Sequence, residues 1–369
     1  MRAVLVLSFL AAFVLSFILT AIIRKVAARI GFVDRPGGYK CHERPMPFGG
    51  GIAVCLVTCA IVLGAALLAQ LWKHHPSSFP ALEAIAEDIG LAAARLPLLL
   101  YILAGGLAMA ALGLVDDIHP VRPVVKLILQ FVIATSVVVI SGMRITAFVP
   151  NDLYQICVTV VWIVFLTNSF NLLDNMDGVS ATVAFICAGS LLVLALQTMQ
   201  FFIAGFLLVL MGAVLGFLFF NFPPAAIFLG DTGSTFIGYM LATATVSTTF
   251  LNQRQANPLF PLLVPAIIFA VPFYDTLSVV AIRLHQGRPI MVGDRYHFSH
   301  RLQRLGKGPR SVLLTMGLVA LATSLGATVP YGSSTWRIVA PAIQALAVVC
   351  VIIELELANT HNHGVAAGG

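Results

Sequence analysis

The residues best suited to chemistry are Asn and Asp side chains spaced three apart between two apolar runs. Asn168, Asn171, Asp174 and Asp177 recur at every third position, and Gly178 follows them. On an α-helix each step of three falls about 60° short of a full turn, so the four side chains cannot share one face. We therefore predict a helix end carrying the two asparagines and then a loop carrying the two aspartates, with Gly178 as the breaker. Their oxygens are the ligands that a hard divalent cation prefers.

A second acidic group is the adjacent pair Asp116 and Asp117, which closes an apolar run and precedes Lys126. Adjacent carboxylates can raise the pKa of one of them, which suits a general base. The alternative is ordinary polarity where a membrane span meets water. The nearby lysine favours the functional interpretation.

The stretch Gly230-Asp-Thr-Gly-Ser234 predicts a helix N-terminus with exposed backbone N–H groups, which would suit a phosphate. Asp231 would repel a phosphate unless a cation lay between them, so the motif fits a metal–diphosphate site. A simple capping role for Asp231 is the alternative.

A basic loop between residues 283 and 310 carries two His, two Arg and a Tyr within ten residues. Such side chains can bind phosphates or a nucleotide, although the loop taken alone is only a basic membrane loop. Its members are Arg295, Tyr296, His297, His300 and Arg301. We expect Asp275, inside the preceding apolar run, to pair with Arg283 in a structural role. Glycines 49–51 at the mouth of another apolar run would let backbones approach closely, and a packing role and a binding role are both open for them.

The elements that must position these groups are transmembrane helices. The 369 residues are 59% apolar and only 10% charged, and their mean hydropathy is +0.98. Soluble domains carry about 25% charged residues, so we predict an all-α polytopic membrane protein with one integral domain over residues 1–369. The net charge of +6 indicates the positive-inside rule rather than nucleic-acid binding. The six cysteines form neither a zinc motif nor a disulfide framework.

Eleven apolar stretches are long enough to cross a bilayer. They lie near residues 3–23, 49–71, 97–115, 124–142, 152–170, 181–199, 201–220, 230–248, 259–282, 312–329 and 336–357. With the N-terminus outside and the C-terminus cytoplasmic, most Lys and Arg residues fall on the cytoplasmic side. The functional aspartates fall on that same face. An ion-coupled transporter is the competing interpretation, but it predicts charges spread through the spans, and Asp275 is the main such residue. We expect residues 358–369 to be a disordered tail.

Together these motifs resemble the polyprenyl-phosphate N-acetylhexosamine-1-phosphate transferases, which form glycosyltransferase family 4. The resemblance runs from about residue 35 to residue 304. The matching pieces are Arg44-Pro-x-Pro-x-Gly-Gly-Gly, Gly-Leu-Val-Asp116-Asp117, Asn168-x-x-Asn171-x-x-Asp174-x-x-Asp177-Gly, Phe228-Leu-Gly-Asp231-Thr-Gly-Ser and His297-x-x-His300-Arg301-Leu302.

The resemblance implies eleven spans in the bacterial inner membrane and a cytoplasmic site dependent on Mg²⁺, for which Mn²⁺ could substitute. Sugar 1-phosphate would pass from a UDP-N-acetylhexosamine to undecaprenyl phosphate, releasing UMP, as the first step of a cell-envelope polysaccharide. A homodimer is compatible with the resemblance. The implied roles are metal ligation for Asp231 and Asn171, base for Asp116, support for Asp117, nucleotide or metal contact for Asp174 and Asp177, and diphosphate or sugar binding for His297, His300 and Arg301. To the substrate-binding residues we add Lys126, Asn168, Asn171 and Arg295 as candidates.

The sequence departs from the family pattern at Ser299. The branch that uses UDP-N-acetylglucosamine has His-x-His-His-Arg-Leu, and Ser299 replaces its middle His. The branch that makes the peptidoglycan lipid precursor, phospho-N-acetylmuramoyl-pentapeptide transferase, carries a triple His that is absent here. The chain is therefore closer to the N-acetylglucosamine branch, and Ser299 leaves the sugar open. A phosphatidyl-alcohol synthase is a further alternative, but its compact multi-Asp helix pattern is missing.

Overall fold

The computed structural model describes residues 2–35, 45–74, 86–145, 150–248, 260–291, 294–328 and 339–353, and these are almost entirely helical. Arg44, the first residue of its motif, Gly293 and the tail 358–369 lie outside the described residues. The elements are α1 (Arg2–Ile30), β1 (Val33–Asp34), β2 (Met46–Pro47), α2 (Gly50–His74), α3 (Ala86–Ala94), α4 (Leu96–Ile118), α5 (Pro123–Ser141), α6 (Asp152–Leu173), α7 (Val179–Gln197), α8 (Phe201–Asn221), α9 (Gly230–Ser247), α10 (Phe260–Ile268), α11 (Ala270–His285), α12 (Phe298–Arg304) and α13 (Pro309–Ala327). A further helix covers Val339–Ile353.

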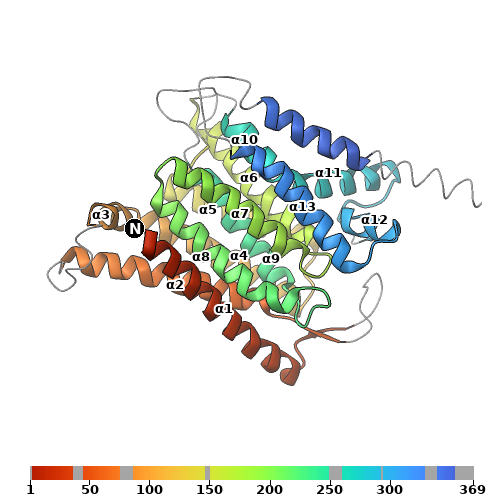
Figure 1. Cartoon of the computed structure of the whole chain (residues 1–369), viewed down its shortest axis with the longest axis horizontal. Helices are drawn as coiled ribbons and strands as arrows, with labels where there is room; N and C mark the ends of the chain where they lie inside the picture. The colour runs from red at the N-terminus through yellow and green to blue at the C-terminus, as the bar shows by residue number, and fades with distance from the viewer. Residues whose placement is uncertain are drawn as a thin grey trace, which may run out of the picture.

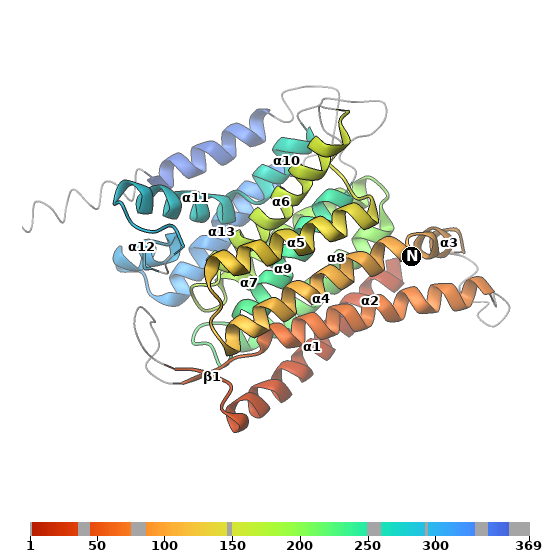
Figure 2. The same cartoon turned by 180° about the vertical axis from the view of Figure 1, so that it is seen from behind.

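The helices form a bundle in which α9 is surrounded by its neighbours. Helices α1, α8, α7 and α13 follow one another across the face seen in Figure 1. From behind, α2, α4, α5 and α6 cover the other face (Figure 2). Helix α9 packs against α2, α4 and α6 between these layers, and most of its residues are buried. Because successive helices alternate in direction, the ends of α4, α6 and α8 meet the starts of α5, α7 and α9 at one end of the bundle.

Close approach of α9 to its neighbours depends on glycine. A Cβ added at Gly51 of α2 would lie 2.2 Å from the backbone nitrogen of Gly233. A Cβ added at Gly113 of α4 would lie 2.3 Å from the carbonyl oxygen of Asp231. Both distances are far below contact, so only glycine allows these backbones to touch. The expectation that the glycines at the start of α2 serve close approach is confirmed.

The segment around β1 and β2 holds the start of α9. The two short strands pair antiparallel, with Val33 opposite Pro47. The Phe228 N–H then donates to the Pro47 carbonyl at 2.9 Å, and the Gly51 N–H donates to the Leu229 carbonyl at 2.9 Å. The chain that enters α9 is thus tied by backbone hydrogen bonds to the chain that enters α2.

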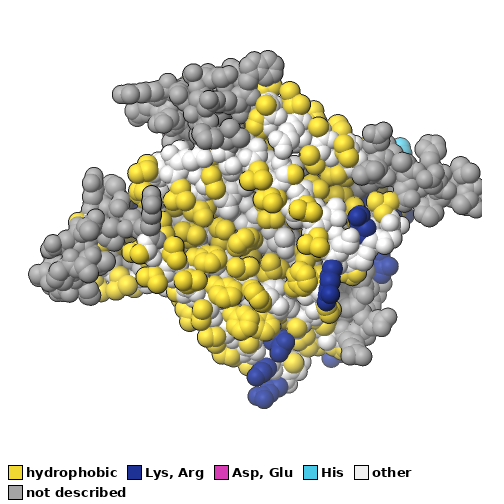
Figure 3. Space-filling view, viewed as in Figure 1, with side chains coloured by type: hydrophobic (Ala, Val, Ile, Leu, Met, Phe, Trp, Pro, Cys, Tyr) yellow, Lys and Arg dark blue, Asp and Glu magenta, His cyan; other side chains and the backbone are white. Residues whose placement is uncertain are grey.

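The outer surface is apolar, as a bilayer requires. Within the described residues, eight helices are long and apolar enough to span a membrane. Large hydrophobic side chains are exposed along α1, α5 and α13. Figure 3 shows this apolar face, with the visible Lys and Arg side chains gathered along its lower right margin. The protein is therefore a multi-pass membrane protein, as its composition predicts.

The expected count of eleven spans is not confirmed. The expected span 230–248 forms α9, which is too polar to rank among the eight. The expected span 259–282 is divided into α10 and α11, with Pro265 inside the first and a break at Phe269. Proline removes an N–H from the helix ladder, so it weakens a continuous span. The last expected span corresponds to the shorter helix Val339–Ile353.

Candidate active site

The ammonium of Lys126 is the centre of a polar cluster at the bundle end described above. Lys126 follows the proline-initiated start of α5, and its Nζ lies 2.8 Å from Asp116 Oδ2 at the end of α4. The same ammonium contacts Asp231 Oδ2 at the start of α9 and Asn171 Oδ1, at 3.3 Å, near the end of α6. We call Asp116, Asp117, Lys126, Asn171 and Asp231 the carboxylate cluster. Four different helices therefore contribute to one site.

Asn171 and Asp231 are oriented by further hydrogen bonds. The Asn171 amide donates to Asp231 Oδ1 at 2.9 Å and to the Ser234 hydroxyl at 2.9 Å. Asp116 Oδ1 accepts from the Val121 N–H at 2.7 Å. These contacts fix the direction in which each oxygen points, as a preorganised site requires.

Asp117 points to a different partner from Asp116 and caps α9. Its Oδ1 accepts from the Asp231 N–H at 2.8 Å, and its Oδ2 accepts from the Thr232 N–H at 3.0 Å and from the Thr232 hydroxyl at 2.7 Å. A carboxylate at a helix N-terminus is stabilised by the free N–H groups and by the helix dipole. The prediction of N–H groups exposed for a phosphate is wrong for Asp231 and Thr232, because Asp117 accepts from both. Gly230, at φ +74°, brings the α9 backbone close to this carboxylate.

The loop between α6 and α7 is built as the spacing of its polar residues predicts. Helix α6 ends at Leu173, Asp174 is its C-cap, and Gly178 at φ +72° precedes α7. Asp177 Oδ2 accepts from the Ala225 N–H at 2.9 Å. Burial, together with the charges of Asp231, Asp117 and Asp177, raises the pKa of Asp174 well above its usual range.

Asn168 lies one helical turn from the cluster, on the far side of Asn171. Its amide donates to Gln130 Oε1 at 2.6 Å and to the Val164 carbonyl at 2.8 Å. Gln130 is wholly buried, one turn along α5 from Lys126. The structure therefore places Asn168 as a support behind the cluster rather than beside its carboxylates.

The second polar group, residues 294–304, is called the histidine segment. His297 Nδ1 lies 2.8 Å from Asp275 Oδ2, and the Phe298 N–H donates to Asp275 Oδ1 at 2.6 Å. Arg283 instead pairs with Asp294, at 2.7 Å from Nε to Oδ2. The expected pairing of Asp275 with Arg283 is therefore wrong. Asp275 and Arg283 both lie on α11. Asp275 fixes the start of α12, and Arg283 fixes Asp294.

Electrostatics within the histidine segment favour a neutral His300 and an ionised Asp294. Burial lowers the pKa of His300, and the hydrogen bond with Gln303 offsets this only in part. Burial alone would raise the pKa of Asp294, but the ion pair with Arg283 holds it below its usual range. Arg295 is exposed, while Arg301 donates to the Ser278 hydroxyl at 2.8 Å and lies 5.4 Å from the Tyr274 ring centroid.

A hydrogen bond joins the histidine segment to the α6–α7 loop. The Ser299 hydroxyl donates to Asn175 Oδ1 in the α6–α7 loop, next to Asp174. Sequence reasoning assigned no role to Asn175 or to Asn221. The Asn221 side chain accepts from the Gly178 N–H at 2.8 Å and donates to the Ile227 carbonyl at 2.9 Å, so it joins two loops. A polar residue at the end of an apolar helix was the only available signal for it.

The chain has clear relatives among known proteins. The model of the family "Glycosyl transferase family 4" matches residues 99–249. A Bacillus subtilis protein named as a probable undecaprenyl-phosphate N-acetylglucosaminyl 1-phosphate transferase is 30% identical over 90% of this chain and 86% of its own length. The chain belongs to glycosyl transferase family 4. A decaprenyl-phosphate N-acetylglucosaminephosphotransferase of Mycolicibacterium smegmatis is 30% identical over 86% of this chain and 80% of its own length. A Yersinia pestis undecaprenyl-phosphate alpha-N-acetylglucosaminyl 1-phosphate transferase is 25% identical over 84% and 80%.

The carboxylate cluster of this family 4 protein has a donor set that suits a hard cation. Oxygens of Asp116, Asn171 and Asp231 already surround one positive group, the Lys126 ammonium. Among the residues that the structure describes, no three His, Cys, Asp or Glu side chains form a complete metal cage. Mg²⁺ rarely uses such a cage, because it binds through one or two carboxylates, waters and substrate phosphates. The residues present therefore fit Mg²⁺ better than a transition metal.

Proposed function

We propose that this chain transfers N-acetylglucosamine 1-phosphate from UDP-N-acetylglucosamine to a polyprenyl phosphate such as undecaprenyl phosphate, and releases UMP. The observation that carries the proposal is the carboxylate cluster, in which Asp116, Asn171 and Asp231 converge on one cationic position. The names of the relatives supply the N-acetylglucosaminyl phosphate and the polyprenyl acceptor. The bacterial relatives support a place in the bacterial inner membrane, and the gathering of Lys and Arg at one margin (Figure 3) supports a cytoplasmic site.

The reaction joins two anions, because a phosphate oxygen of the acceptor attacks the β-phosphorus of the UDP-sugar. The protein must therefore offset charge and hold the groups in line. Mg²⁺ held by Asp231, with Asn171 beside it, would supply charge neutralisation at the diphosphate. Lys126, which is paired with Asp116 and Asp231, supplies a fixed positive charge beside that site. The second pKa of a phosphate monoester is near 6, so the acceptor phosphate is already mostly deprotonated at neutral pH. Asp116 is therefore not needed as a base, and we assign it the role of orienting the phosphate.

The donor's nucleotide and sugar would lie between the α6–α7 loop and the histidine segment. His297 is fixed by Asp275 through Nδ1, which leaves Nε2 as the ring atom that can meet a ligand. Neutral His300 and the guanidinium groups of Arg295 and Arg301 add donors for the diphosphate or sugar.

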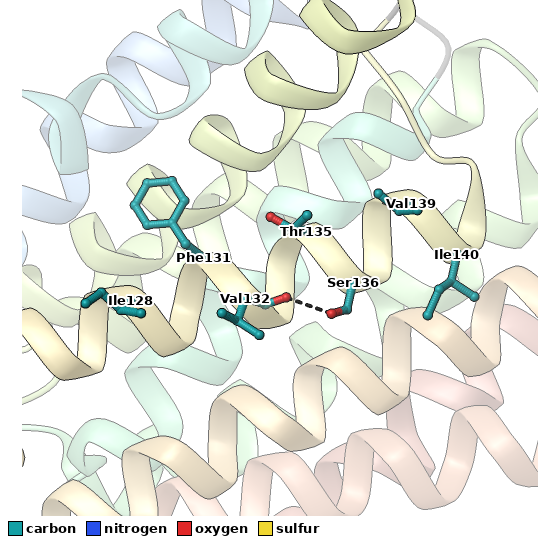
Figure 4. A pocket seen from close by; sticks show the side chains of 7 residues that line it. All are labelled: Ile128, Phe131, Val132, Thr135, Ser136, Val139 and Ile140. Carbon is teal, nitrogen blue, oxygen red and sulfur yellow. Dashed lines mark hydrogen bonds between the residues drawn. The ribbon is translucent and has the colours of Figure 1, made fainter.

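The acceptor's apolar tail has a surface available beside the cluster. A groove of about 720 Å³ follows α5 and is lined by Ile128, Phe131, Val132, Thr135, Ser136, Val139 and Ile140 (Figure 4). The Ser136 hydroxyl donates to the Val132 carbonyl at 2.8 Å, so this polar group is satisfied within the helix. Helix α5 also carries Lys126, so an isoprenoid chain along this helix would leave its phosphate near the cluster.

The test is UMP release by the purified protein in detergent with UDP-N-acetylglucosamine and undecaprenyl phosphate. We expect release only when both the lipid and Mg²⁺ are present, with Mn²⁺ as a weaker substitute. Asp231→Asn keeps the shape of the side chain but loses its charge, and we expect release to fall by about 10²–10³-fold. Release with a different UDP-N-acetylhexosamine alone would change the donor assignment, and no release with any nucleotide sugar would refute the transferase.

A further inference from the structure

Ser299 occupies the position at which the sequence departs from the family's histidine pattern. It joins the histidine segment to the α6–α7 loop. Its side chain is fully buried in α12. Its hydroxyl donates to Asn175 Oδ1, between the aspartates of the α6–α7 loop. The histidine segment and that loop are thus joined by a side-chain hydrogen bond.

The direction of this hydrogen bond is fixed by the surroundings of Asn175. The Asn175 Nδ2 donates to the Leu172 carbonyl at 2.8 Å, in the last turn of α6. The amide nitrogen is therefore committed to the helix, and the amide oxygen faces Ser299 as an acceptor. A hydroxyl can donate to it, whereas an alanine would leave it without this partner.

The start of α12 is consequently held from two sides. On one side Asp275 of α11 accepts from the Phe298 N–H and binds the His297 ring. On the other side Ser299 reaches the α6–α7 loop. A serine side chain is short, so the hydroxyl contact requires the two backbones to be close, and an imidazole at the same position would hold them further apart.

We infer that the Ser299–Asn175 hydrogen bond sets the spacing between the histidine segment and the α6–α7 loop, and thereby tunes binding of the nucleotide sugar. This inference rests on the proposed function, because it takes the space between these segments as the donor site. Ser299 is a positioning residue, since its buried hydroxyl cannot reach a ligand. It acts through Asn175, which is half-buried and follows Asp174.

Kinetics of UMP release separate a positioning role from a general loss of fold. With saturating undecaprenyl phosphate, we expect Ser299→Ala to raise the KM for UDP-N-acetylglucosamine by about tenfold, the effect of one lost hydrogen bond, and to change kcat by less than about threefold. Asn175→Ala should act alike, and the double variant should be no worse than either single one. Ser299→Thr keeps the hydroxyl and should restore the KM.

Two comparisons complete the kinetic test. Ser324→Ala is the matched control, because Ser324 is equally buried but its hydroxyl bonds only within α13. The preference for UDP-N-acetylglucosamine over UDP-N-acetylgalactosamine should fall in Ser299→Ala and stay unchanged in Ser324→Ala. An unchanged KM in Ser299→Ala, or additive effects of the two alanines, would overturn the inference.

Amide hydrogen exchange tests the same contact without activity. We expect faster exchange over residues 174–178 in Ser299→Ala than in wild type, and no change there in Ser324→Ala. If wild type released no UMP with any donor, the proposed function would fail, and exchange would still report on the contact. Unchanged exchange over this loop would show that Ser299 does not position it.

Discussion

The carboxylate cluster and the histidine segment are held in place by different physical means. The cluster sits at the ends of α4 and α6 and the starts of α5 and α9, and the α9 backbone touches α2 at Gly51 and α4 at Gly113. The histidine segment contains only the short helix α12 and is fixed by side chains, chiefly the pairs Asp275–His297 and Arg283–Asp294. Packing is spread over many contacts, whereas an ion pair is lost with a single substitution. The cluster should therefore resist polar substitutions that displace the segment.

The largest effect should come from Asp294→Asn. Arg283 is 2% exposed, so removing its partner leaves a buried charge and should lower the free energy of unfolding by about 3 kcal/mol. The pKa of Asp294 is below its usual value, so its contribution is full above the unfolded pKa of about 3.9 and is lost as the pH falls through the folded pKa. Thermal unfolding in detergent should show a fall in melting temperature between pH 7 and pH 3 in wild type and a smaller fall in the variant.

Gly113→Ala should break the cluster while sparing the histidine segment. The new Cβ meets the Asp231 carbonyl, so α4 and α9 must separate, at a cost of about 1–3 kcal/mol. A misplacement of about 1 Å at a reacting centre can cost about 10²-fold in rate, which UMP release would detect. Gly64→Ala on α2 is the matched control, because a Cβ there meets no atom within 4 Å. Equal activity of the two variants would contradict the role of close helix packing.

Asp275→Asn should act on the histidine segment through His297. The amide can accept one of the two hydrogen bonds that the carboxylate accepts, so one buried donor loses its partner, at a cost of about 1–2 kcal/mol. We expect weaker binding of UDP-N-acetylglucosamine, with Asp117 still capping α9. An increase in KM measured by UMP release, without loss of folded protein, would support this; a selective loss of metal dependence would oppose it.

The smallest effect is a gain in stability in Asp174→Asn, at the joint between the two regions. The pKa of Asp174 is raised, so its ionised form is disfavoured in the folded state, and its cost appears as the pH rises above about 3.9. The variant should melt at a higher temperature than wild type at pH 7, and the difference should vanish near pH 4. Asp152→Asn, at the other end of α6, serves as the control. A lower melting temperature at pH 7 would contradict the assignment.

Local chemistry could be predicted from the sequence where it depends on spacing. The end of α6, the break at Gly178 and the start of α9 follow from helix periodicity and glycine. The partners of Asp117 and Asp275 could not be predicted, because they join residues far apart in the chain. Periodicity describes one helix at a time, and nothing in it indicates which helix lies beside Asp275.

The number of membrane spans could not be predicted from hydropathy for a related reason. Hydropathy indicates how well a segment tolerates contact with lipid, but α9 is buried among other helices and has almost no such contact. Its 18 residues include Gly, Thr, Ser and Asp, while its side chains are covered by α2, α4 and α6. A protein-lined position relaxes the demand for apolar side chains. The helix that carries Asp231 therefore falls outside the eight helices that hydropathy marks as spans.

The burial of α9 also has a consequence for how the protein is made. A helix this polar gains little by entering lipid alone, so its insertion must draw on helices already in the membrane. Helices α2, α4 and α6 precede α9 in the chain and leave the ribosome first. They are therefore available to pack against α9 when it is made, with Gly51 and Gly113 at the contact. The residues that α4, α5 and α6 contribute to the carboxylate cluster are therefore synthesised before Asp231, which comes last.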